Sequence, residues 1–180
     1  MYRITKLRID EIKKRRHDEY VKRCSEISTE AVKAGRFRSS AHSLEIIETA
    51  YNCVKELFTD ILDVERNALK GRILFLRQDT YFNELISSLR TSMLVEYKKF
   101  LDQEFLSTSS AYEAGRYQNP LENLTIQEKI EEYKDRIHRL VVDTINSMRV
   151  EFKQDRNRSI LKAIPKIIEK IIETLLGRVK

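Results

Sequence analysis

The sequence predicts an all-α protein, an elongated antiparallel bundle of four to five long helices with an apolar C-terminal helix. Only four Gly and two Pro occur in 180 residues, whereas sheets and tight turns need many more of both. Apolar residues recur every three to four positions over long segments, as on one face of a helix. We expect a bundle over residues 1–158, with a long loop at 107–123. Residues 159–180 should form an amphipathic helix packed on the bundle or on a partner chain.

The first helix is expected from about Ile4 to Ala34 and should end at Gly35, a residue typical of the position just after a helix. Its apolar stripe thins out between Lys13 and Glu19, where charged residues occupy every side. The residues predicted to face the core share helical spacing: Ile9, Ile12, Tyr20, Cys24, Ile27, Ala31 and Ala34.

The second helix should begin after a cap at Ser39 or Ser40 and reach about Leu69. Asp79 is expected to cap a third helix that runs to about Phe105. Between these helices, Gly71 interrupts the pattern, and we favour helix over strand for residues 72–77 because the chain offers no partner strand.

A fourth helix should open with the capping box Thr125–Glu128, in which each side chain bonds the other residue's backbone N–H. The polar segment 154–159 then predicts an interruption before a last helix, from about Ser159 to Leu176. Pro165 is expected to bend that helix or to begin it.

The last helix carries a broad apolar face opposite its charged residues. It comprises Ile164, Ile167, Ile168, Ile171, Ile172, Leu175 and Leu176. So many apolar side chains need cover from the bundle, another chain or a membrane surface. We expect no membrane partner, because the helix lacks the aromatic residues typical of interfacial helices. The bundle itself, another copy or a protein partner is therefore expected to cover this face.

The loop at 107–123 is a second candidate contact because it is too long for a tight connection between helices. Tyr112, Arg116 and Tyr117 lie within it. Aromatic and arginine side chains together favour a protein contact or stacking against bases.

Net charge is +6, with basic ends and an acidic middle: residues 1–38 carry 12 basic and 6 acidic residues, and residues 39–148 carry 13 and 18. The basic ends could lie against the acidic middle or against a polyanion. The second reading predicts sequence-independent nucleic-acid binding by the first helix. Its candidate residues are Arg8, Lys14, Arg15, Arg16, Lys22 and Lys33. Interleaved acids favour instead an exposed face supported by ion pairs along the helix.

Arg36 and His42, beside the start of the second helix, form the one arrangement that suggests catalysis. The segment Arg36-Phe-Arg-Ser-Ser-Ala-His42 resembles the R-x(4–6)-H element of HEPN ribonucleases, whose motifs meet across a dimer to cleave RNA. The resemblance implies that His42 moves a proton and that Arg36 stabilises the phosphorane charge. The alternative is that Arg36 is solvated and His42 belongs to the helix cap.

No cofactor or metal site is expected. The glycines are too scattered for a phosphate-binding loop, and Cys24 and Cys53 are isolated and fit buried thiols in a reducing compartment. Residues 1–16 lack the apolar segment of a signal peptide, which favours a cytoplasmic location. The sequence thus favours a non-enzymatic adaptor or scaffold that self-associates. Nucleic-acid binding and HEPN-like ribonuclease activity are the alternatives.

Overall fold

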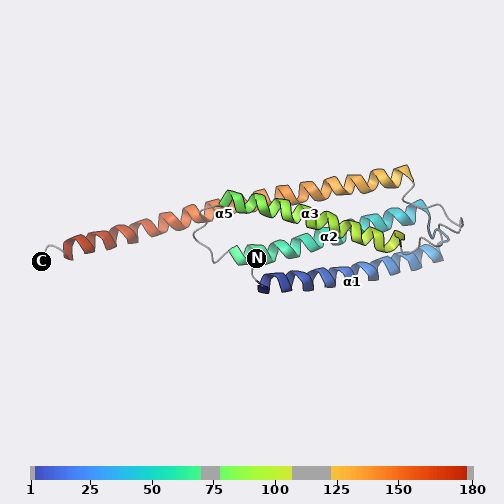
Figure 1. The fold of residues 1–180 in the computed structure, drawn as a ribbon, viewed down its shortest axis with the longest axis horizontal. Coiled ribbons are helices and arrows are strands. Elements are labelled where there is room, and N and C mark those ends of the chain that lie inside the picture. Colours follow the sequence, from blue (N-terminus) through green and yellow to red (C-terminus); the bar gives the residue numbers. More distant parts are fainter. Residues whose placement is uncertain (1–2, 70–77, 107–122, 178–180) are drawn as a thin grey trace.

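The computed structural model describes residues 3–69, 78–106 and 123–177, and Figure 1 traces their path. Over these ranges the chain forms four helices and no strand: α1 Arg3–Lys33, α2 Ser40–Leu69, α3 Gln78–Leu106 and α5 Leu124–Gly177. The all-α prediction is confirmed. The sequence interpretations of Gly71, of residues 72–77 and of loop residues 107–122, with Tyr112, Arg116 and Tyr117, concern segments outside the described residues.

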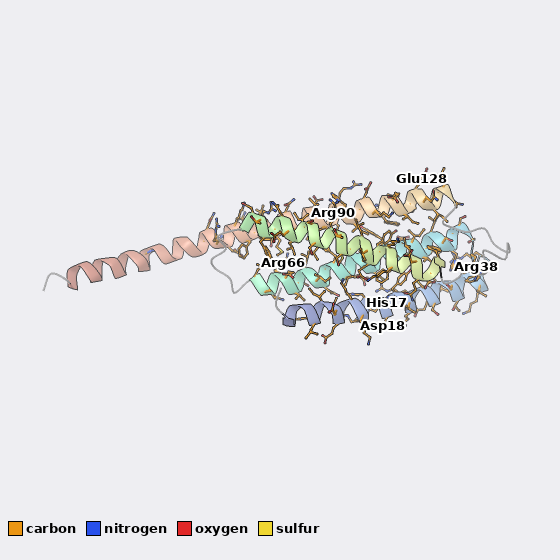
Figure 2. The ribbon with its side chains drawn as sticks, viewed as in Figure 1. His17, Asp18, Arg38, Arg66, Arg90 and Glu128 are labelled. Atoms are coloured by element: carbon orange, nitrogen blue, oxygen red, sulfur yellow. The ribbon has the colours of Figure 1, made fainter. Side chains whose placement is uncertain are left out.

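Successive helices run in opposite directions, so the bundle is antiparallel and elongated (Figure 1). α2 packs against each of the other three helices, whereas α1 contacts chiefly α2 and, to a small extent, α3. α3 and α5 pack along each other. The charged side chains of Asp18, Arg90 and Glu128 lie on the exposed outer surfaces of α1, α3 and α5 (Figure 2).

The core is one continuous apolar cluster. Most predicted core positions of α1 are confirmed, since Ile9, Tyr20, Cys24 and Ala31 are buried and Ile12 and Ile27 pack partly against the cluster. Ala34 is the exception: α1 ends at Lys33, and Ala34 is exposed in the turn that follows. Tyr20 of α1 is among the largest fully buried side chains, and the other three helices supply Ile46, Ile47, Leu57, Phe58, Ile61, Phe82, Met93, Tyr97, Phe100, Ile126 and Ile137.

The connection between α1 and α2 is built as the sequence predicts. Gly35 adopts φ 66°, the Arg36 N–H donates to the Ala31 carbonyl (2.9 Å), and the Gly35 N–H donates to the Val32 carbonyl (3.1 Å). This pair of bonds is the Schellman arrangement, which satisfies carbonyls at a helix C-terminus. On the far side, the Ser39 hydroxyl accepts from the His42 N–H (3.2 Å) and caps α2.

Two helix starts differ from expectation. α3 begins at Gln78, so Asp79 lies within its first turn. The cap of α5 is Asn123, not Thr125: its side-chain oxygen accepts from the Thr125 N–H at 3.0 Å. Asn is among the strongest N-cap residues, and its position one residue before the helix outcompetes the capping box.

The expected interruption at 154–159 is absent, and α5 continues as one helix to Gly177 through Pro165. The polar segment contains no residue that is sterically barred from a helix, so its polarity reflects solvent exposure. Pro165 is exposed. Proline removes one backbone hydrogen bond from a helix but need not end it when its neighbours all favour helix. Figure 1 shows this part of α5 continuing well past the ends of the other helices.

Candidate functional site

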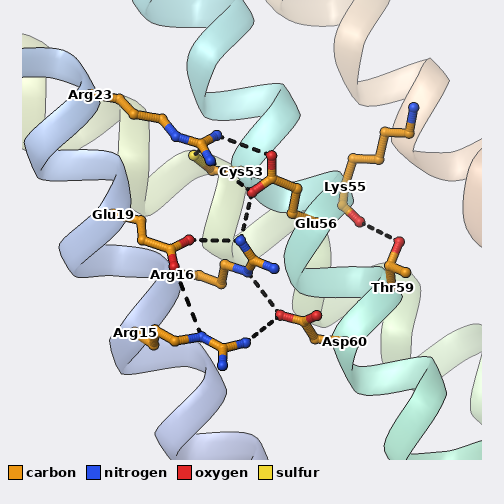
Figure 3. Close-up of polar contacts among 9 residues, drawn as sticks. All are labelled: Arg15, Arg16, Glu19, Arg23, Cys53, Lys55, Glu56, Thr59 and Asp60. Carbon is orange, nitrogen blue, oxygen red and sulfur yellow. Dashed lines mark hydrogen bonds and ion pairs between the residues drawn. The ribbon is translucent and has the colours of Figure 1, made fainter. Parts of the chain in front are cut away.

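Six charged residues of α1 and α2 form a compact charge cluster, comprising Arg15, Arg16, Glu19, Arg23, Glu56 and Asp60 (Figure 3). Arg16 lies at its centre, with only 17% of its side chain exposed. Its guanidinium reaches Glu19 at 2.6 Å, Glu56 at 2.7 Å and Asp60 at 2.8 Å. Three carboxylates therefore surround one arginine between two helices.

Two further arginines extend the cluster along α1. Arg23 forms a forked contact with Glu56, at 3.1 Å from each nitrogen to a separate carboxylate oxygen. Arg15 contacts Asp60 at 2.8 Å, although 57% of its side chain remains exposed. Planar guanidinium–carboxylate contacts of this kind are among the stronger and more directional ion pairs.

The electrostatics of the cluster favour charged arginines. Hydrogen bonding to Asp60 raises the pKa of Arg16 above its ordinary value, against the opposing effect of burial. Hydrogen bonding to Glu56 likewise raises the pKa of Arg23. An arginine in such a setting is a permanent cation that binds and positions carboxylates but does not exchange protons.

The predicted nucleic-acid-binding residues divide into two groups in the structure. Arg15 and Arg16 are paired with Asp60, so they contact the acidic middle of the chain. Arg8, Lys14, Lys22 and Lys33 are exposed on α1. Exposed acids interrupt this second group, namely Glu11, Asp18 and Glu26, and Lys22 lies 3.9 Å from Glu26.

Lys13 ties α1 to α3. Its Nζ contacts the Glu96 carboxylate at 3.0 Å and the Ser92 hydroxyl at 3.2 Å. Glu96 is buried and also accepts from Lys99 at 3.2 Å. The charged stretch of α1 is therefore attached to two neighbouring helices.

Arg36 and His42 lie at the α1–α2 connection, where each already has partners. Arg36 pairs with Glu45. The Arg38 N–H donates to His42 Nδ1 (3.3 Å), which places the proton of the neutral ring on Nε2, facing the Ser28 hydroxyl at 3.2 Å. To act as a general base on Ser28, His42 would need an unprotonated Nε2. The tautomer in this structure therefore does not form a catalytic Ser–His pair.

Burial lowers the pKa of His42 below its ordinary value, and the nearby guanidinium groups of Arg36 and Arg38 act in the same direction, whereas Glu45 opposes them. The ring is 8% exposed and packs beside Phe37, with centroids 5.2 Å apart. In this structure His42 joins the end of α1 to the start of α2. The ribonuclease hypothesis for Arg36 and His42 stays a prediction.

The two cysteines are free and buried, as predicted. Burial raises the pKa of the Cys24 thiol to about 12 and also raises the pKa of Cys53. Both thiols are therefore protonated and unreactive at neutral pH. Within the described ranges, no three His, Cys, Asp or Glu side chains gather as a metal site would require. No described helix combines the length and apolar character that crossing a bilayer demands.

Glu56 and Asp60 are the residues that sequence reasoning missed. They are spaced by four on the polar side of α2, and they lie opposite the basic stretch of α1 once the two helices fold back on each other. Acid residues at i and i+4, facing a basic segment across a short connection, are a signal that could have identified them.

The apolar residues of the last helix lie on the part of α5 that extends beyond the bundle. The described backbone is helical through Gly177. Ile164, Ile168, Ile171 and Leu175 are therefore separated by three or four residues on a continuous helix, and they share one face.

Comparison with known proteins does not indicate a function for the chain. No family model matches the chain, and no curated protein or solved structure is detectably similar to it.

Proposed function

We propose that this protein is a non-enzymatic assembly protein that associates with further copies of itself through the projecting part of α5. The observation that carries the proposal is the continuation of α5 as a helix past the rest of the bundle (Figure 1). Its sequence places apolar residues along one face of just this segment. A solvated helix with such a face is only marginally stable alone, because helices in proteins gain most of their stability from packing.

The energetic case rests on area removed from water. Burying an isoleucine or leucine side chain contributes about 1.5–3 kcal/mol. Six or more such residues on one helix offer a driving force large enough to offset the entropy lost on association. The segment lacks the aromatic residues that are typical of membrane-surface helices, which favours a protein partner.

The order of residues on this face also favours a particular number of strands. Leu161, Ile168 and Leu175 recur every seven residues, with Ile164 and Ile171 between them. The first heptad position is therefore leucine twice and isoleucine once, and the fourth is isoleucine; both combinations favour three or four strands over two. Ile167 and Ile172 widen the face beyond a two-stranded seam, in agreement with that preference.

The test replaces both Ile168 and Ile171 with Asp and compares sedimentation velocity with that of the unmodified protein. We expect dissociation to monomers, because two carboxylates cannot be buried in an apolar seam. The matched control is Lys162→Gln with Lys166→Gln. It changes the net charge by the same amount on the opposite face of the helix, and the assembly should persist. Equal sedimentation of all three proteins as monomers would refute the proposal.

A further inference from the structure

The two halves of α1 are attached to the bundle by different forces. In the C-terminal half, Tyr20 is fully buried, stacks on Phe100 with centroids 4.5 Å apart, and donates its hydroxyl to the Phe100 carbonyl at 2.9 Å. Cys24 and Ala31 are also buried in the same half. Apart from the Arg23–Glu56 ion pair at its start, this half is held by apolar packing, which salt does not weaken.

The preceding half, residues 7–19, is here named the amino-terminal arm. From residue 10 to residue 19 no side chain is fully buried, and Ile12 packs only partly against the core. The arm contacts its neighbours mainly through charge: Lys13 pairs with Glu96 of α3, and Arg16 pairs with carboxylates of α2. The exposed His17 ring also lies beside Phe100 of α3, with centroids 6.0 Å apart. Ile9, at 8% exposure, is its one buried apolar side chain.

Added salt weakens ion pairs but does not weaken apolar contacts. The screening length falls from about 10 Å at 0.1 M salt to about 3 Å at 1 M, close to the separations within the charge cluster. Sodium chloride should therefore weaken the attachment of the arm and leave that of Tyr20 and Cys24 unchanged. Proteins open in contiguous cooperative segments, and a segment held by few apolar contacts opens first.

We propose that the amino-terminal arm is an ionically held lid that undocks from α2 and α3 when ionic strength rises, with its hinge at Tyr20. Undocking removes both arginine partners of Asp60, and it removes Arg16 from Glu56 and Lys13 from Glu96. Arg23 stays paired with Glu56 and Lys99 with Glu96, so the uncovered acidic strip is centred on Asp60. The helices α2, α3 and α5 stay packed, because the arm contributes only Ile9 to their buried core and Ile12 packs only partly against it.

Hydrogen exchange of the full chain at neutral pH tests this lid directly. Between about 0.1 M and about 1 M sodium chloride, amides of residues 10–18 should exchange about tenfold faster, as expected from the loss of several partly exposed ion pairs. Amides of residues 24–33 should keep their rates at both salt concentrations. Equal rates for the two halves at both concentrations would overturn the proposal.

A pair of variants separates the lid from general effects of salt. Arg16→Met keeps an apolar stem but removes the charge, so the arm should exchange rapidly at low salt and lose its response to added salt. Lys134→Met is the matched control, because Lys134 pairs with Glu131 on its own helix at 2.6 Å. Its arm should behave as in the unmodified protein. If Arg16→Met kept both the protection and the salt response of the arm, the lid would not depend on the charge cluster and the proposal would fail.

Discussion

Tyr20 and Tyr97 are two fully buried tyrosines with opposite hydrogen-bonding states. The Tyr20 hydroxyl donates to the Phe100 carbonyl, whereas the buried Tyr97 hydroxyl has no hydrogen-bond partner among the described residues. Burial raises the pKa of both phenols, so each keeps its proton. A buried polar group without a partner costs about 1–3 kcal/mol, more than a typical hydrogen bond contributes.

Replacing each tyrosine by phenylalanine should therefore give opposite results. Tyr20→Phe should lower the free energy of unfolding by about 1 kcal/mol, and Tyr97→Phe should leave it unchanged or raise it. Urea unfolding followed by circular dichroism measures both. A loss for Tyr97→Phe as large as that for Tyr20→Phe would mean that the Tyr97 hydroxyl is satisfied.

His42 makes the α1–α2 connection sensitive to acid. Its folded-state pKa is lowered from 6.5, so the unfolded chain binds the proton more readily than the folded chain. Stability is then complete above about pH 6.5 and falls as pH decreases toward the folded pKa. Protonated Nδ1 would also face the Arg38 N–H, which is itself a donor.

The measurement is the urea midpoint at several pH values between neutrality and the range where carboxylates titrate. We expect the midpoint of the unmodified protein to fall on acidification, and that of His42→Gln to fall less. The two surrounding guanidinium groups, Arg36 and Arg38, strengthen the effect, while Glu45 moderates it. Parallel curves for the two proteins would show that His42 does not control this response.

At the scale of the helix, Asn123 and Thr125 give competing accounts of where α5 is capped. The side-chain oxygen of Asn123 lies 3.0 Å from the Thr125 nitrogen and 3.4 Å from the Ile126 nitrogen. Asn123→Ala should therefore cost about 1 kcal/mol of unfolding free energy, and Thr125→Ala should cost little. Thermal unfolding of the two variants decides between the accounts, and a reversed order would restore the capping box.

Helices were predictable from sequence because their signals are local. Apolar spacing, Gly35 and Ser39 each act within a few residues, and the structure uses them as expected. The interruption at 154–159 was wrong because a polar composition marks exposure, which a helix projecting from the bundle also has. Pro165 also favoured the prediction of a separate last helix, but proline disfavours a helix without excluding it.

Contacts between helices were predicted less well than the helices themselves. The charge distribution offered contact between the basic ends and the acidic middle as one of two alternatives, and Arg16 makes such a contact. Its partners Glu56 and Asp60 depend on the register of α1 against α2, which no local pattern specifies. For the same reason the sequence did not distinguish Arg15 and Arg16, which are paired with α2, from Lys14 and Lys22, which are exposed.

At the scale of the whole molecule, the ion pairs between helices and the apolar stripe of α5 lie in different regions. The charge cluster and Lys13 join α1 to the bundle, while the apolar stripe of residues 164–175 lies on the part of α5 beyond it (Figure 1). Four antiparallel helices, one of which projects beyond the others, agree with the proposal that the protein positions copies or partners relative to one another. Among the described residues His42 is the buried histidine, and each of its two ring nitrogens has a hydrogen-bond partner.

Sedimentation equilibrium of the unmodified full chain over a range of concentrations tests self-association most directly. The chain mass is 21.4 kDa. We expect a mass three or four times that value, because the apolar face of α5 is wider than a two-stranded seam and combines leucine and isoleucine in the order that favours three or four strands. A dimer would refute the number of strands but keep the self-association. A mass of 21.4 kDa at every concentration would contradict the account.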